Sequence, residues 1–251
     1  MSQSPLRVLV VGATGSIGRA TVDALLSRGH RVTCFVRDSV RDRESVRGDV
    51  ARGSVRDDST RDDSMRDARG RRGLPDACDV RHGDVSSRDS VRDDAFGDDS
   101  FDAVVSCMAS RTGAPRDAWE IDHAAQLNVL HGAVATGVGH FVLLSAICVQ
   151  KPRLEFQRAK LAFEERLIAS GLSYSIVRPT AFFKSLSGQI ARVRAGKPFL
   201  LFGDGRLTAC KPIGDDDLGR FMALCLTDPA KANRVLPIGG PGPALTPRAQ
   251  G

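Results

Sequence analysis

A short apolar run that leads directly into three evenly spaced glycines constrains this chain more than any other feature. Residues 6–11 have the composition of a buried strand, the pattern G-x-x-G-x-x-G follows at once, and residues 19–27 have helical spacing. Glycines let the backbone turn tightly and approach a pyrophosphate, while a helix N-terminus offers free N–H groups to phosphates. The strand–turn–helix context therefore predicts a dinucleotide-binding loop. This loop consists of Gly12, Ala13, Thr14, Gly15, Ser16, Ile17 and Gly18.

Apolar runs alternate with helical patterns along most of the remaining chain. This alternation predicts an α/β fold with a Rossmann-type, doubly wound parallel sheet. Both faces of such a sheet are buried, which explains near-continuous apolar runs such as VLVV and FVLLS. We expect a dinucleotide-binding domain over residues 1–180 and a small substrate-side region over 181–251. The further strands are predicted at 31–36, 77–80, 103–107, 141–145 and 174–177, and the further helices at 119–136 and 156–169.

A polar, repetitive stretch interrupts this pattern between the second and third predicted strands. Within residues 38–72 the unit S-x-R-D or S-x-R-G occurs five times, and residues 37–72 hold 11 arginines against 9 acidic residues. Its apolar content is too low for a core, so we expect a solvated insert of mixed charge. Because the acids nearly cancel the arginines, the insert is not expected to bind nucleic acid.

The composition excludes several other classes of protein. With 251 residues, of which 41% are hydrophobic, the chain is not expected to be disordered throughout. No apolar run approaches the roughly 18–20 residues of a transmembrane helix. Because a strand-like run begins at residue 6, we do not expect a secretory signal or a long transit peptide. None of the six cysteines forms a C-x-x-C pair or clusters with histidines, so we expect reduced thiols and no metal site.

The ends of the second and third strands bear on the choice of cofactor. NAD-preferring sites usually have an acidic residue after the second strand, whereas this chain has Arg37. A guanidinium group suits a ribose 2′-phosphate, so NADPH is favoured over NADH. The alternative is that Arg37 simply begins the charged insert. Asp84 and Val85 follow the third strand and are expected near the adenine.

Two residues of the second half are candidates for catalysis. Ser145 ends the fifth strand, and Lys160 lies on the next helix, four residues after Phe156. This arrangement resembles short-chain dehydrogenases, which carry Y-x-x-x-K there, with a tyrosine acid and a lysine that binds ribose. Phe156 has no proton to donate, so a different group or water must supply it. The alternative for Lys160 is an ordinary surface lysine.

Long stretches of the chain then resemble one particular family. These stretches are similar to the NADPH-dependent divinyl chlorophyllide 8-vinyl reductases, atypical short-chain dehydrogenases related in fold to isoflavone reductases. The resemblance covers nearly the whole chain outside residues 38–72. It is carried by residues 104–113, 140–164, 174–189, 196–213 and 236–247.

The resemblance implies a reaction, a substrate and a location. NADPH would reduce the 8-vinyl group of divinyl chlorophyllide or protochlorophyllide to ethyl, so the expected partner is a tetrapyrrole pigment. The family's F-x-x-x-K matches Phe156 and Lys160. Members of the family have an aromatic residue at the position of Ser16. Their sequences also continue beyond the position of residues 247–251, so we expect a shortened substrate region. The expected compartment is the bacterial cytoplasm, or the plastid stroma in a phototrophic eukaryote.

The resemblance and the carboxyl ends of the strands together suggest further contacts. Phe182 and Phe183 would form an apolar wall for a flat pigment, with core packing as the alternative. Lys184 would bind the substrate carboxylate, as would Arg178 or Lys211, and the alternative is that these are plain surface cations. The candidates along the cofactor are Ser106, Ala109, Ser110, Pro179 and Thr180.

The charge and the missing tyrosine leave other interpretations open. Residues 151–251 carry 16 basic and 8 acidic side chains, which favours an anionic pigment and allows peripheral association with a membrane. One rival hypothesis is an NADP-binding sensor without catalytic activity, similar to NmrA-like regulators. Another is an atypical reductase of a different aromatic alkene.

Overall fold

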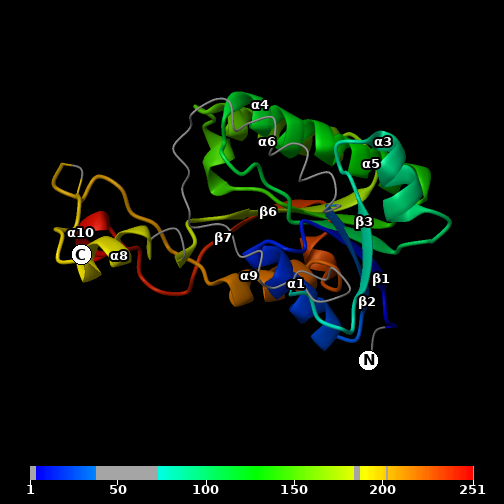
Figure 1. Ribbon diagram of the computed structural model, residues 1–251, viewed down its shortest axis with the longest axis horizontal. Coiled ribbons are helices and arrows are strands. Elements are labelled where there is room, and N and C mark those ends of the chain that lie inside the picture. The colour runs from blue at the N-terminus through cyan, green and yellow to red at the C-terminus, as the bar shows by residue number, and fades with distance from the viewer. Residues whose placement is uncertain (1–3, 38–72, 184–186, 202, 251) are drawn as a thin grey trace.

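Seven parallel strands form one sheet through the centre of the protein (Figure 1). The computed structural model describes residues 4–37, 73–183, 187–201 and 203–250. The strand order is β3-β2-β1-β4-β5-β6-β7, and all neighbouring strands are parallel. The predicted doubly wound sheet is therefore confirmed. The strands are β1 (Arg7–Val11), β2 (Arg31–Arg37), β3 (Asp79–Gly83), β4 (Ala103–Ser106), β5 (His140–Leu144), β6 (Ser173–Pro179) and β7 (Arg234–Ile238).

Helices cover both faces of this sheet. In Figure 1, α1 and α9 lie on one face, and α5 and α6 lie on the other. The helix that contains α5 is continuous from residue 115 to 135, with a π-helical middle, η4. The helices are α1 (Ser16–Ser27), α3 (Arg88–Ser90), η3 (Val91–Phe96), α4 (Pro115–Asp117), η4 (Ala118–Ala125), α5 (Gln126–Ala135), η5 (Ile147–Gln150), α6 (Glu155–Ile168), η6 (Ser187–Gln189), α8 (Ile190–Arg194), α9 (Asp215–Leu224), η7 (Pro229–Lys231) and α10 (Pro247–Gln250).

The alternation of side chains along β1 shows how the core is divided. Val8 and Val10 point into the layer that packs under α1 and α9, whereas Leu9 and Val11 point into the layer under α5 and α6. All four side chains are fully buried. Successive residues of a strand face opposite sides of the sheet, so a strand covered on both sides must be apolar throughout.

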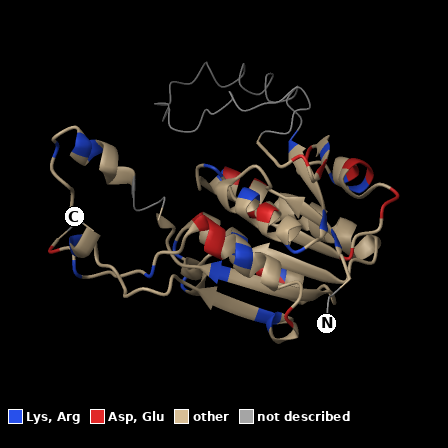
Figure 2. Cartoon of the chain, turned by 90° about the horizontal axis from the view of Figure 1, so that it is seen from below, with Lys and Arg blue, Asp and Glu red and all other residues tan. Residues whose placement is uncertain are grey.

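The C-terminal part of the chain contributes to the sheet and also extends away from it. β7 pairs with β6, and α9 packs against α1. Neither element was predicted from the sequence. The segments that contain α8 and α10 extend away from the end of the sheet (Figures 1 and 2). The division at residue 180 stays a prediction, and the predicted insert at 38–72 lies outside the described residues.

The contact between α1 and α9 depends on a glycine in the middle of α9. A Cβ atom at Gly219 would lie 2.5 Å from the carbonyl carbon of Ala20 and 2.8 Å from the amide nitrogen of Thr21. Both are backbone atoms, so the two helices would have to move apart. The close packing of this face of the sheet therefore requires glycine at this position.

We expect Gly219→Ala to destabilise the protein by about 1–3 kcal/mol, the usual cost of overpacking a core, although alanine is the better helix former. The measurement is the free energy of unfolding in urea. Gly242→Ala is the matched control, because a Cβ there meets nothing within 4 Å. An unchanged or raised stability of the Gly219 variant would contradict this account of the packing.

Candidate functional site

The glycine loop after β1 fits tightly against the backbone that follows β4. Gly12 has a φ of +77°, and a Cβ atom there would lie 2.7 Å from backbone atoms of Cys107 and Met108. A Cβ at Gly18 would lie 2.1 Å from the Gly12 carbonyl oxygen. Only glycine fits at either position. At Gly15, by contrast, the nearest atom to an added Cβ is 3.5 Å away, so the fold itself leaves space there.

The loop delivers the N-terminus of α1 to the carboxyl ends of β1 and β4. Gly15 precedes the first turn of α1, and no side chain of the described residues caps it. The first turn also holds no acidic residue. Uncapped N–H groups and the positive end of the helix dipole can bind a phosphate. β1 and β4 are neighbours at the point where the strand order reverses, which is where doubly wound sheets bind nucleotides.

The predicted cofactor residues of β2 and β3 end beside each other. Arg37 ends β2 in register with Gly83, and Asp84 follows directly. The Asp84 Oδ1 atom accepts hydrogen bonds from the Ser86 amide and hydroxyl at 2.9 and 2.7 Å. The carbonyl of Val85 accepts a hydrogen bond from the Asn128 side chain at 3.0 Å. These bonds shape the turn after β3. This turn lies at the rim of the crevice, by which we mean the region at the carboxyl ends of the strands.

The segment after β4 is anchored by buried polar contacts. Ser106 is fully buried, and its hydroxyl donates to the Gln126 side-chain oxygen at 2.8 Å. Ala109 is exposed at the end of this segment. The backbone N–H of Ser110 donates to Oδ1 of Asp122 at 3.1 Å. The continuous helix of residues 115–135 thus fixes the course of the chain along the predicted cofactor.

Lys160 is buried and paired rather than exposed. Its Nζ atom lies 2.8 Å from Oδ1 of Asp122, and the two side chains are 10% and 0% exposed. The predicted surface alternative for Lys160 is therefore wrong. Phe156, one turn earlier on α6, is half-buried, and a Cβ atom added at Gly113 would lie 3.7 Å from its ring. The i, i+4 spacing places both side chains on the same side of α6.

Ser145 belongs to a second buried network on the same helix. Its hydroxyl donates to Oε1 of Glu164, which is 1% exposed. Glu164 in turn forms an ion pair with Arg178 of β6. The hydroxyl proton of Ser145 and the guanidinium of Arg178 are thus both engaged with one carboxylate.

The predicted residues after β6 meet the segments around residues 211 and 238. Pro179 ends β6, and the amide of Thr180 donates to the Ile238 carbonyl at 2.9 Å. Phe182 pairs with Ile213 and packs partly against the core, whereas Phe183 is 55% exposed. Lys184 lies outside the described residues.

Comparison with known proteins identifies the family of the chain. The sequence profile of the NAD dependent epimerase/dehydratase family matches residues 8–234. The chain belongs to this family. One curated relative, "Divinyl chlorophyllide a 8-vinyl-reductase, chloroplastic" of Oryza sativa subsp. indica, is 46% identical over 256 residues. The match covers 100% of this chain and 58% of the relative, so the chain spans little more than half the length of that protein.

Solved structures of similar proteins show the same fold. UDP-glucose 4-epimerase from Thermotoga maritima, solved with UDP-glucose, has a TM-score of 0.74 at 18% identity, covering 97% of this chain and 80% of that one. AtPrR2, solved with NADP+ and (+)pinoresinol, has a TM-score of 0.69 at 21% identity, covering 99% and 74%. The NAD dependent epimerase/dehydratase family supports a nicotinamide dinucleotide as the class of cofactor.

The candidate site contains two acidic residues that were not predicted from the sequence, Asp122 and Glu164. Each is an acidic residue within a helix that packs against the sheet, and each is almost fully buried. The sequence contained one signal for them, an acidic residue on the apolar side of a helical pattern. Such a residue becomes buried when the helix packs, and a buried charge needs a partner. Within the described ranges, no group of three or more His, Cys, Asp or Glu residues lies close enough to hold a metal ion.

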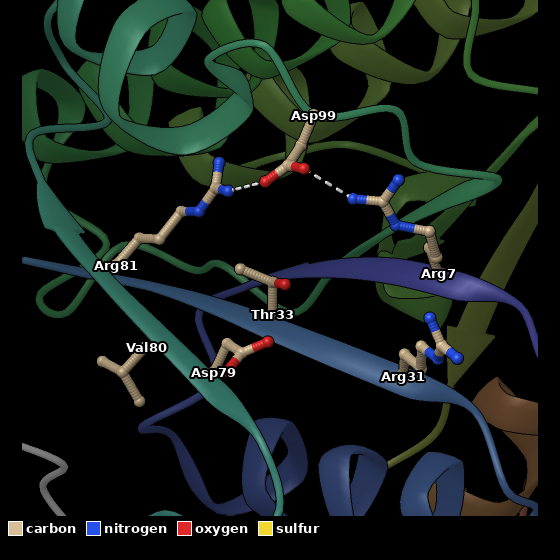
Figure 3. A pocket seen from close by; sticks show the side chains of 7 residues that line it. All are labelled: Arg7, Arg31, Thr33, Asp79, Val80, Arg81 and Asp99. Atoms are coloured by element: carbon tan, nitrogen blue, oxygen red, sulfur yellow. Dashed lines mark hydrogen bonds and ion pairs between the residues drawn. The ribbon is translucent and has the colours of Figure 1, made fainter.

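A hollow of about 640 Å³ lies at the opposite edge of the sheet, at the amino ends of β1, β2 and β3 (Figure 3). Doubly wound sheets bind nucleotides at the carboxyl ends of their strands, so this hollow at the amino ends is not the expected cofactor site. Figure 3 shows Asp99 between the guanidinium groups of Arg7 and Arg81. The hollow is lined by Arg7, Arg31, Thr33, Asp79, Val80, Arg81 and Asp99.

The ion pairs of Asp99 make the free energy of unfolding depend on pH. Arg7, and Arg81 with it, hold the pKa of Asp99 below its ordinary value of 3.8. A carboxylate with a lowered pKa stabilises the fold at neutral pH. This stabilisation is lost as the pH falls through 3.8 toward the lowered pKa, because the unfolded state then binds a proton that the folded state does not.

We therefore expect the difference in urea midpoint between the wild type and Asp99→Asn to be constant above about pH 5 and to narrow below it. The measurement is urea unfolding at a series of pH values. Asp98→Asn is the matched control, since Asp98 is exposed and forms no ion pair within the part of the chain that the structure describes. A difference that stayed constant down to pH 3 would refute the role of Asp99.

Proposed function

We propose that this protein reduces the 8-vinyl group of divinyl chlorophyllide or protochlorophyllide to an ethyl group with NADPH, as a step in chlorophyll or bacteriochlorophyll biosynthesis. The observation that carries the proposal is the 46% identity to the rice 8-vinyl-reductase over the whole chain. The site supports it, because buried Lys160 lies one helical turn after Phe156 on α6, in a sheet whose strand order suits nucleotide binding.

The residues of the glycine loop fit a dinucleotide. Gly12 and Gly18 keep the loop close to β4 and α1, and Gly15 leaves space at the uncapped helix N-terminus where a pyrophosphate would lie. Arg37 ends the adjacent strand, where its guanidinium can bind a ribose 2′-phosphate. The other proposed contacts are Asp84 and Val85 near the adenine, and Ser106, Ala109, Ser110, Pro179 and Thr180 along the cofactor.

Reduction of a vinyl group adds one hydride and one proton to its two carbons. The nicotinamide supplies the hydride when it is bound. Lys160 orients the nicotinamide ribose, because its ammonium group is buried at the crevice. Phe156 contributes packing and no proton, and the Ser145 hydroxyl already donates its hydrogen bond to Glu164. The proton therefore comes from a different group or from water.

The substrate side combines exposed aromatic surface with positive charge. Phe183 is largely exposed beside Phe182, which suits a flat pigment, and Lys184 follows directly in sequence. Figure 2 colours the basic positions blue along the lobe, by which we mean the segments around α8 and α10 that extend from the sheet. These charges suit a substrate carboxylate and a membrane surface rich in anionic lipid. The basic residues of the lobe are Arg192, Arg194, Lys197, Arg206, Lys211 and Arg248.

The proposed location follows from the relative and from the sequence. The rice protein is named as chloroplastic, so we propose the plastid stroma for a chain from a phototrophic eukaryote and the cytoplasm for a bacterial one. None of the helices in the described ranges is long and apolar enough to cross a membrane. Contact with a membrane, as proposed, would be peripheral.

We expect Gly15→Ala to leave the stability unchanged and to weaken NADPH binding by about tenfold or more, since the methyl group would occupy the space of the pyrophosphate. NADPH fluorescence titration and thermal unfolding measure the two effects. Gly18→Ala is the comparison, because its methyl group collides with the Gly12 carbonyl and should lower the stability itself. Wild-type binding by the Gly15 variant would place the pyrophosphate elsewhere.

The proposed reaction has a direct spectroscopic test. On incubation with NADPH and divinyl chlorophyllide, the Soret band of the pigment should shift to the blue as the vinyl group is lost. A parallel incubation with NADH should react more slowly if Arg37 binds the 2′-phosphate. NADPH binding without any spectral shift would refute the reductase proposal and favour a nucleotide sensor.

A further inference from the structure

We propose that Asp122 is a positioning residue for Lys160, and that the two side chains bind the nicotinamide nucleotide as one unit. This proposal rests on the proposed nucleotide site, but its test does not require the vinyl reduction to occur. Neither the family match nor the named relatives assign a role to Asp122.

The geometry ties three segments of the crevice to one carboxylate oxygen. Oδ1 of Asp122 lies 2.8 Å from Nζ of Lys160 and accepts the backbone N–H of Ser110 at 3.1 Å. Asp122 belongs to η4, Lys160 to α6 and Ser110 to the segment after β4. The carboxylate therefore fixes the position of the ammonium group relative to the proposed cofactor path.

The pair is costly, which argues that it serves more than stability. Both side chains are almost completely buried, and Oδ2 of Asp122 has no hydrogen-bond partner within the described residues. A buried ion pair is often no more stable than a well-packed apolar pair, and an unsatisfied carboxylate oxygen adds to its cost. We attribute the pair to the ammonium group that it holds at the carboxyl ends of the strands.

The local backbone also departs from an ordinary helix at Asp122. Residues 118–125 are π-helical between the α-helical turns of α4 and α5. A π-turn inserts a residue into a helix and changes which side chains share a face, and such turns are frequent at functional sites. Here the π-helical turns pack against α6, the helix that carries Lys160.

The pair leaves Lys160 able to bind a ligand. An ammonium group has three N–H donors, and Asp122 is the one partner that the described part of the chain gives to Nζ. The other two donors can reach ribose hydroxyls, and the ion pair holds the nitrogen where they do so. Asp122 thus acts on the nucleotide through Lys160 rather than by touching it.

The test is a double-mutant cycle on NADPH affinity, measured by fluorescence titration without pigment. Asp122→Asn and Lys160→Ala should each weaken binding by about tenfold, and the double variant should bind no more weakly than Lys160→Ala, because contacting residues are not additive. In turnover, Asp122→Asn should raise the KM for NADPH and leave the KM for pigment unchanged. Losses that multiply, or wild-type binding by Asp122→Asn, would overturn the proposal.

Two further variants separate positioning from folding. Glu120→Gln is the matched control, since Glu120 is an exposed acid on the same helix that pairs with Arg116, and it should bind NADPH normally. The apolar pair Asp122→Leu/Lys160→Met should keep the fold, losing at most the hydrogen bond from Ser110, and should bind NADPH as weakly as Lys160→Ala. Normal NADPH binding by this apolar pair would also overturn the proposal. If every variant behaves as expected while the wild type leaves the pigment unreduced, the proposed reaction fails and the role of Asp122 stands.

Discussion

The close approach of the glycine loop to the backbone after β4 is the contact on which the rest of the site depends. The space between Gly12 and the Cys107–Met108 peptide is too small for any side chain at position 12. This contact holds the N-terminus of α1 against the end of β4, and β4 is the strand that leads to Ser110. The contact of Gly12 with the Cys107–Met108 peptide therefore determines where the proposed phosphate site lies. It also determines the course of the segment from β4 to Ser110, which binds Asp122 of the Asp122–Lys160 pair.

Helix α6 connects this crevice to the other half of the sheet through two buried charges of opposite sign. Lys160 reaches Asp122 on the helix beside it, while Glu164, four residues later, reaches Ser145 and Arg178 at the ends of β5 and β6. Buried charges are tolerated only when they are paired. One helix face thus joins the ends of β4, β5 and β6 by polar contacts, where apolar packing alone would leave the register of α6 less defined.

The sequence was sufficient to predict what depends on local pattern. The apolar strands β1, β2, β4, β5 and β6, the turn at the glycine loop and the helical spacing of α6 follow from neighbours along the chain, and the structure confirms them. The third strand lies at Asp79–Gly83 rather than at the predicted 77–80. β7 was missed because its five residues contain Pro237 and are half exposed, as an edge strand allows. α9 was missed because it begins with three aspartates and contains Gly219, which weakens its helical signal although the acids suit a helix N-terminus.

Only the part of the site that depends on local pattern was predictable from the sequence. Lys160 and Ser145 were identified from their spacing after a strand, yet their partners depend on which segments the fold brings together. Asp122 lies 38 residues before Lys160, and Arg178 lies 14 residues after Glu164. No local pattern encodes such pairs. A buried acid in a helix indicates that a partner exists, and only the tertiary structure says which one it is.

An ordinary short-chain dehydrogenase has a hydroxyl side chain at two positions of its site, and in this chain neither position offers a free hydroxyl. A phenylalanine occupies the first, and the second, Ser145, is bound to Glu164. A carbonyl substrate needs a donor at its oxygen, because negative charge develops there in the transition state. A vinyl group conjugated to a macrocycle spreads that charge over its own π-system and makes a weaker demand on the protein. The proposed site, in which Lys160 would orient the cofactor and neither of these two positions offers a free hydroxyl, is therefore better suited to an activated alkene than to a ketone.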